Sequence, residues 1–114
     1  MKEQEQLLEE NIREFYTQGE ESLTKQKYNA AVSLFFKALA VLADWHLLKT
    51  KGRIPKSHSE RFRILEEKYP ELYELLDKDF PVYQDSYQIK ISKEIAVVLE
   101  NDVRTVAQKV GFSL

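Results

Sequence analysis

A histidine within a group of basic residues is the feature of this chain best suited to chemistry. His58 lies in the pattern Ser57-His58-Ser59-Glu60, which is typical of a capping box and predicts a helix that begins at His58. The free N–H groups of a first helical turn attract anions. The bases close to this turn are Lys51, Arg53, Lys56, Arg61 and Arg63. We therefore predict a nucleotide- or anion-binding site formed by Arg53, Lys56, His58 and Arg61.

The uneven distribution of charge supports this prediction, although the net charge is only −2. Residues 49–63 hold six bases and one acid, whereas residues 1–21 and 66–85 each hold seven acids and two bases. The alternative is that these bases merely solvate a loop and a helix end, as runs of charge usually do. Three scattered glycines exclude a Walker or dinucleotide-binding loop, so any anion site has to be of another kind.

The other side chains are weaker candidates for a functional site. The only other histidine, His46, follows Trp45 in an apolar segment and is expected to pack. The absence of cysteine excludes thiolate chemistry and, with two distant histidines, predicts no metal site and no cofactor. Tyr83 and Tyr87 are candidates for stacking on a nucleotide base, although tyrosines more commonly pack in a core. The chain begins without a secretory pattern, so we expect a soluble, cytoplasmic protein that does not enter a membrane.

The hydrophobic pattern predicts an all-α protein with a single domain over residues 1–114. A stripe from Leu8 to Leu23 indicates the first helix, with Gly19 either a weak point or a place where a neighbouring helix comes close. The second helix covers about Tyr28 to Lys49 and ends at Gly52. Later helices are predicted from His58, from residues 72–76 towards Phe80-Pro81, and from Ser92 to Gly111. Residues 83–91 match both strand and helix, and we expect a short helix or turn.

The second helix has too much apolar surface for one partner. Sixteen of its 21 residues from Tyr28 to Leu48 are apolar, and the polar Asn29 and Asp44 belong to one narrow strip. This helix is therefore either the centre of the bundle or shares a face with another subunit. We assign a dimer interface to its second apolar seam, which consists of Val32, Phe36, Leu39 and Ala43.

The first two predicted helices look like one tetratricopeptide repeat. The resemblance rests on the spacing of Phe15, Gly19, Ala31, Phe35 and Ala38. Nothing after Gly52 repeats this spacing, and such helix pairs normally need about three copies to bury their faces. A protein-interaction module is therefore an alternative interpretation.

A larger part of the chain, about residues 7–110, resembles the HEPN family, the higher eukaryote and prokaryote nucleotide-binding domain. The residues that carry this resemblance are Tyr28-Asn29-Ala30-Ala31 with Phe35 and Lys37-Ala38-Leu39, then Lys51-Gly52, Pro55 and Ser57-His58, and later Tyr83, Tyr87 and Ser92-Lys93-Glu94-Ile95-Ala96. The resemblance implies an up-and-down antiparallel bundle of four to five helices, commonly a homodimer. It also implies a small nucleotidyltransferase as partner, in a two-component or toxin–antitoxin pair.

Some HEPN proteins are ribonucleases with an Arg and a His four to six residues apart near the start of the last helix. Arg104 in the last predicted helix has no such His after it, so the resemblance implies no catalytic residues here. Arg53 and His58 have the spacing, but they lie in another part of the chain, and a metal-independent ribonuclease that uses them is a further alternative. The leading hypothesis is a non-catalytic HEPN-like domain that binds a nucleotide or RNA, a nucleotidyltransferase, or both.

Overall fold

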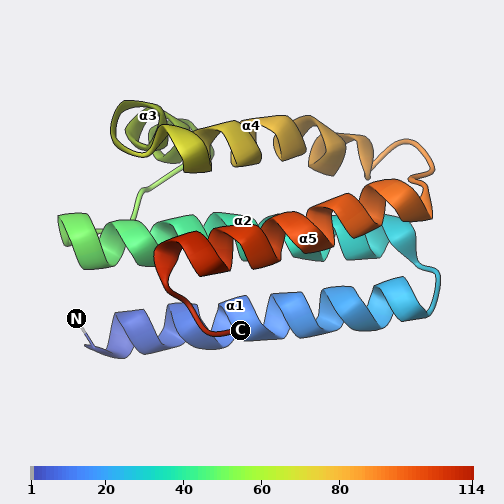
Figure 1. Ribbon diagram of the computed structural model, residues 1–114, viewed down its shortest axis with the longest axis horizontal. Helices are drawn as coiled ribbons and strands as arrows, with labels where there is room; N and C mark the ends of the chain where they lie inside the picture. Colours follow the sequence, from blue (N-terminus) through green and yellow to red (C-terminus); the bar gives the residue numbers. More distant parts are fainter. Residues whose placement is uncertain (1) are drawn as a thin grey trace.

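The computed structural model describes residues 2–114, which form five helices and no strand. The helices are α1 (Lys2–Thr24), α2 (Tyr28–Lys51), α3 (His58–Lys68), α4 (Pro70–Asp85) and α5 (Lys93–Val110). In Figure 1, α1, α2, α4 and α5 follow the long axis of the molecule in alternating directions, whereas α3 is seen end-on because it crosses them. The radius of gyration, 13.4 Å, is that of one compact body of this length. The predicted all-α helical bundle is confirmed.

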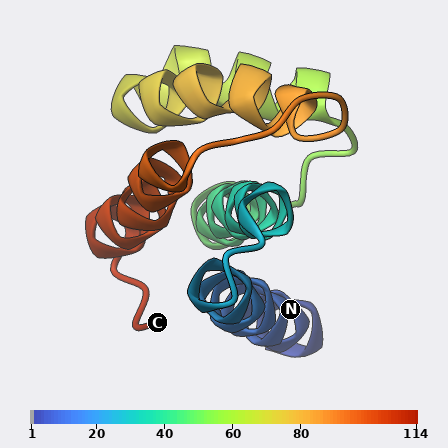
Figure 2. The ribbon, with the colours of Figure 1, turned by 90° about the vertical axis from the view of Figure 1, so that its right-hand side faces the viewer.

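The helix α2 lies at the centre of the bundle because its apolar side chains point in nearly every direction. Viewed from the end in Figure 2, α1 lies on one side of α2, α5 on a second, and α3 and α4 on a third. Within the described residues, α2 is the only helix long and apolar enough to cross a membrane. However, 72% of the 18-residue apolar stretch of α2 that meets this criterion is buried inside the protein. The apolar surface of α2 therefore serves the core.

This central position corrects the predicted dimer interface. Val32, Leu39 and Ala43 have 0% of their surface exposed, and Phe36 has 1%. Residues so completely covered by their own chain cannot contact a second subunit. The assignment was wrong because other helices of the same chain cover both apolar seams of α2. The helices that follow the loop after Gly52 cover the second seam.

Several predicted helix ends are confirmed. Gly52 and Gly111 follow α2 and α5 in the left-handed conformation, with φ of 82° and 77°. Ser57 and Ser92 are the N-cap residues that precede α3 and α5, and each side chain accepts a hydrogen bond from the backbone N–H three residues later. The helix α4 is longer than predicted and continues through Pro81 to Asp85.

The inner seam of α5 begins at Ala96, although the apolar Ile95 precedes it. Ile95 is 41% exposed, and Ala96 takes the inward position together with Leu99, Val103 and Val106. A seam at 96, 99, 103 and 106 keeps the helical period, but a small residue occupies its first position. The spacing alone did not distinguish these two registers, because Ile95 and Ala96 are both apolar.

Gly19 is a point of close approach between α1 and α2. A Cβ atom placed on Gly19 would lie 2.6 Å from Cε1 of Phe35, whose side chain is completely buried. The tight contact between these two helices therefore requires glycine at this position.

We predict that Gly19→Ala destabilises the protein although alanine favours helix. The gain in helix propensity is about 1 kcal/mol, whereas overpacking against an immobile ring costs about 1–3 kcal/mol. The free energy of unfolding measured in urea should therefore fall, while Gln18→Ala at the exposed neighbouring position should leave it nearly unchanged. A Gly19→Ala protein as stable as the wild type would contradict the close-approach interpretation.

Candidate functional site

The predicted site residues lie in the loop 52–57 after α2, at the start of α3, at the end of α4 and in the turn that follows α4. Arg53 and Lys56 are exposed in the loop, and His58 is exposed in the first turn of α3. Tyr83 lies in the last turn of α4, and Tyr87 follows in the turn that leads to α5, where it is 71% exposed. The fold therefore has to join the basic loop and the two tyrosines.

The half-buried ring of Phe80 and the buried ring of Phe36 provide this junction. The ring of Phe80 lies 5.3 Å from His58 and 6.1 Å from Tyr83, centre to centre. The ring of Phe36 from α2 lies 6.4 Å from His58 and stacks on Tyr83 at 4.9 Å. Because Phe36 and Phe80 contact both, His58 and Tyr83 belong to one aromatic surface. We call His58, Phe80, Tyr83 and Tyr87 the aromatic row.

The two tyrosines at the end of this row interact with each other. Their hydroxyl oxygens are 2.9 Å apart, and the ring of Tyr87 meets that of Tyr83 edge-on at 5.6 Å. The hydrogen bond to Tyr87 raises the pKa of Tyr83, and partial burial raises it further. The Tyr83 hydroxyl group is therefore protonated at neutral pH, and Tyr87 presents its ring to solvent.

Asn29 holds the turn that carries Tyr87. Its side-chain Nδ2 donates to the carbonyl oxygens of Ser86 at 2.9 Å and Ile89 at 2.6 Å, and its Oδ1 accepts from the backbone N–H of Ile91 at 3.0 Å. One amide side chain at the start of α2 thus fixes three backbone groups between α4 and α5. The exposed position of Tyr87 depends on this support.

Arg61 is buried and does not contribute to a surface site. Its Nε donates to Oδ1 of Asp44 at 2.8 Å, and its Nη2 donates to Oδ2 of Asp44 at 2.9 Å. The two side chains are only 11% and 9% exposed. The predicted anion-binding role of Arg61 was therefore wrong, because a buried carboxylate already neutralises it. The sequence pattern placed Asp44 on the narrow polar strip of α2, where solvent would reach it, and so did not identify it as the partner of Arg61.

The third nitrogen of Arg61 determines the chemistry of His58. Nη1 of Arg61 lies 2.6 Å from Nδ1 of His58, and a guanidinium group can only donate. Nδ1 is therefore the acceptor, and the proton of a neutral imidazole lies on Nε2. Partial burial lowers the pKa of His58, the charge of Arg61 lowers it further, and Asp44 opposes this shift. At neutral pH, His58 is an uncharged ring that offers an Nε2–H donor.

Arg53 and Lys56 meet at the carboxylate of Glu60. Oε1 of Glu60 accepts from Nη1 of Arg53 at 2.9 Å and from the backbone N–H of Lys56 at 3.2 Å. These hydrogen bonds lower the pKa of Glu60, with the one from the Lys56 backbone having the largest effect. Within residues 2–114 the ammonium group of Lys56 has no acidic partner at ion-pair distance, and the Arg53 side chain is 55% exposed. The loop thus keeps positive charge in excess of Glu60.

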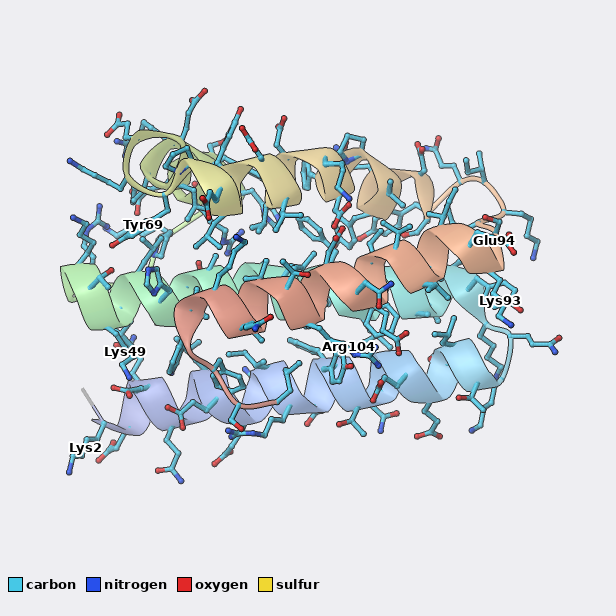
Figure 3. All side chains as sticks on the ribbon, viewed as in Figure 1. Lys2, Lys49, Tyr69, Lys93, Glu94 and Arg104 are labelled. Atoms are coloured by element: carbon cyan, nitrogen blue, oxygen red, sulfur yellow. The ribbon has the colours of Figure 1, made fainter. Side chains whose placement is uncertain are left out.

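Arg53 and His58 point to different partners. Arg53 contacts Glu60, whereas His58 contacts Arg61 and the rings of Phe36 and Phe80. The other arginine of interest, Arg104, reaches from α5 towards α1 (Figure 3). There its Nε donates to the Tyr16 hydroxyl at 2.6 Å and its Nη2 lies 3.1 Å from Glu20. Neither arginine is paired with a histidine in this structure.

His46 is packed, as expected. Its ring meets Tyr69 edge-on at 4.6 Å, at a hollow of about 290 Å³ between α2, the start of α4 and the end of α5. Burial lowers its pKa, and the nearby charge of Lys49 adds to this shift. Across residues 2–114 no three His, Asp or Glu side chains are grouped as metal ligands.

Comparison with models of known protein families and with curated protein sequences finds no match to this chain.

We predict that Asp44→Ala strongly destabilises the protein. Removing one partner of a buried ion pair leaves the other charge without compensation, which costs about 3–5 kcal/mol. The free energy of unfolding in urea should fall by that order, whereas Glu21→Ala, which removes the exposed partner of Lys25, should change it by less than about 0.5 kcal/mol. A loss below about 1 kcal/mol for Asp44→Ala would mean that Arg61 is solvated in solution.

Proposed function

We propose that this chain is a non-catalytic, HEPN-like domain that binds a nucleotide on the surface formed by the basic loop and the aromatic row. The observation that supports the proposal most is the continuity of the rings from His58 through Phe80 to Tyr83 and Tyr87. A nucleotide needs cations or N–H donors at one end and a flat apolar surface at the other. The loop and the row offer these side by side.

The phosphate end of the ligand would meet several donors. Lys56 and the exposed part of Arg53 supply positive charge, and Nε2–H of His58 supplies a neutral donor. The backbone N–H groups of His58 and Ser59 lie in the first turn of α3, and no internal acceptor takes them among the described residues. Glu60 faces the same loop, so a bound phosphate would have to displace it from Arg53.

The base would stack on Tyr87. This ring is the most exposed large apolar side chain of the described residues, and its edge is fixed by Tyr83. Aromatic stacking tolerates any base, so the site would select nucleotides as a class. The partnership with a small nucleotidyltransferase, and a role in a two-component or toxin–antitoxin pair, rest on the HEPN resemblance alone.

We expect titration calorimetry at low salt to show binding of ATP, GTP or a short RNA to the full chain. Lys56→Glu should weaken binding at least about tenfold and reduce its salt dependence, because a cation next to the phosphate is replaced by an acid. Tyr87→Ala should cost about 1–3 kcal/mol of binding free energy through lost stacking. The RNA should remain intact, because the proposal assigns no catalytic residue.

Lys90→Glu is the matched control, since Lys90 is an exposed lysine of the α4–α5 turn outside the proposed phosphate end. Absence of heat with all three ligands, or equal weakening by Lys56→Glu and Lys90→Glu, would refute the nucleotide site. RNA cleavage by the wild type but not by His58→Ala would replace it with the ribonuclease alternative.

A second candidate function, a protein-interaction module, is favoured by exposed apolar side chains around the start of α5. Ile89, Ile95 and Val98 are 54%, 41% and 45% exposed, and Tyr87 precedes them. Exposed apolar residues grouped in one region are typical of binding surfaces, whereas single ones are ordinary. A partner on this region would contact α5 and the turn before it, next to the aromatic row.

We predict that Val98→Asp abolishes retention of a protein partner in pull-downs from the native host. A charge in an apolar interface has to be desolvated without compensation, which costs several kcal/mol. Leu7→Asp is the matched control, because Leu7 is 56% exposed but lies on α1. Recovery of the same protein with the wild type and both variants would exclude the region around Val98 as the interface.

A further inference from the structure

Asp79 is the most unusual buried group of the described residues. It lies in α4, 1% of the residue is exposed, and its Oδ2 is buried without a hydrogen-bond partner. A buried carboxylate oxygen without a partner costs free energy, so natural proteins rarely keep one without a purpose. Neither the nucleotide site nor the core packing uses it.

Asp79 lies beside a second acid and one cation. Nζ of Lys78 is 3.4 Å from Oδ1 of Asp79 and 2.8 Å from Oδ2 of Asp102 on α5. Both carboxyl groups therefore surround the same ammonium group at the boundary between α4 and α5. If both acids were ionised, one half-exposed cation would face two negative charges, and a net negative charge would remain on carboxyl groups that are only 2% and 12% exposed.

A proton on Asp79 would give its unpartnered oxygen a hydrogen bond and would remove the excess negative charge. A protonated carboxyl group has one O–H donor, and the neighbouring carboxylate of Asp102 is a suitable acceptor. We propose that Asp79 and Asp102 share a proton beneath Lys78, that this proton fastens α4 to α5, and that the two helices loosen when it is lost.

The titration behaviour of Asp79 agrees with this geometry. The pKa of Asp79 is raised to about 8: burial has the largest effect, the neighbouring Asp102 raises it as well, and Lys78 opposes the shift. No titratable group from α2 or α3 shifts the pKa of Asp79: Asp44 of α2 is held by Arg61 of α3, and His46 of α2 packs on Tyr69. The pKa of Asp79 therefore depends on its burial and on two charged neighbours, Lys78 and Asp102.

The boundary between α4 and α5 is suited to opening. Between the two helices lies a groove of about 380 Å³, lined by Glu71, Glu74, Leu75, Lys78, Thr105 and Lys109. The side-chain hydrogen bonds that cross it within residues 2–114 are Lys78 to Asp102 and the exposed pair Lys109 to Glu71. Loss of the shared proton adds repulsion between Asp79 and Asp102 beside the partly buried contact from Lys78 to Asp102, so the groove widens there.

The sign of the effect on stability follows from the direction of the shift. A carboxyl group whose pKa is raised in the folded state binds more protons there than in the unfolded chain. Its stabilising contribution is fully present below the unfolded value of about 4 and is lost as the pH rises through about 8. Alkaline pH should therefore weaken the fold.

We expect the melting temperature of the wild-type chain to be lower at pH 9 than at pH 6 by on the order of 5–10 °C. Hydrogen exchange, corrected for the intrinsic effect of pH, should be faster in α4 at pH 9. Asp79→Asn mimics the protonated acid and should remove both differences. Asp77→Asn is the matched control, an exposed acid of the same helix, and should keep the wild-type profile.

The proposal would be overturned if Asp79→Asn kept the pH dependence of the wild type, or if α4 exchanged equally at both pH values. A carbon-13 titration of the Asp79 carboxyl group in the wild-type chain tests the proton directly, even if the variant does not fold. A midpoint above about pH 7 supports the shared proton, and a midpoint near the ordinary value of about 4 refutes it.

Discussion

The enclosure of α2 is the constraint on which the rest of this structure depends. A helix with apolar side chains around most of its circumference is stable in water only when other helices cover it on several sides. The chain meets this requirement with α1 and α5 on two sides and the pair α3–α4 on the third (Figure 2). The buried charged residue of α2, Asp44, could be buried only together with a cation, and Arg61 of α3 is that cation. The same pair therefore fixes the position of α3, of the loop before it and of His58.

This arrangement explains why the candidate site is both basic and aromatic. Arg61 serves the interior and directs His58, so the surface charge comes from Arg53 and Lys56. Phe36 belongs to the core of α2, yet its ring supports His58 on one side and Tyr83 on the other. A surface that is an extension of the core is rigid, and rigid surfaces lose little conformational entropy when they bind a ligand.

The sequence was sufficient to predict the helices, but it was not sufficient to predict which residues their polar side chains contact. Hydrophobic period, the caps at Ser57 and Ser92 and the glycines at 52 and 111 are local signals, and each acted as local chemistry requires. The prediction of a dimer interface was wrong because a hydrophobic pattern shows that a seam is buried but does not show which chain buries it. The anion-binding role predicted for Arg61 was wrong for a similar reason, because an ion pair between residues 17 positions apart has no local sequence signature. Asp79 and Asp102 could have been suspected, since each lies three residues after a buried leucine, on the apolar side of its helix.

The nucleotide surface is tested most directly by mapping ligand-induced shifts in a nitrogen-15 NMR spectrum of the full chain titrated with ATP at low salt. We expect shifts at the backbone amides of Lys56, His58 and Ser59 and at the turn around Tyr87, with Nε2 of His58 remaining protonated. Shifts confined to other parts of the protein, or no shifts at millimolar ATP, would contradict it.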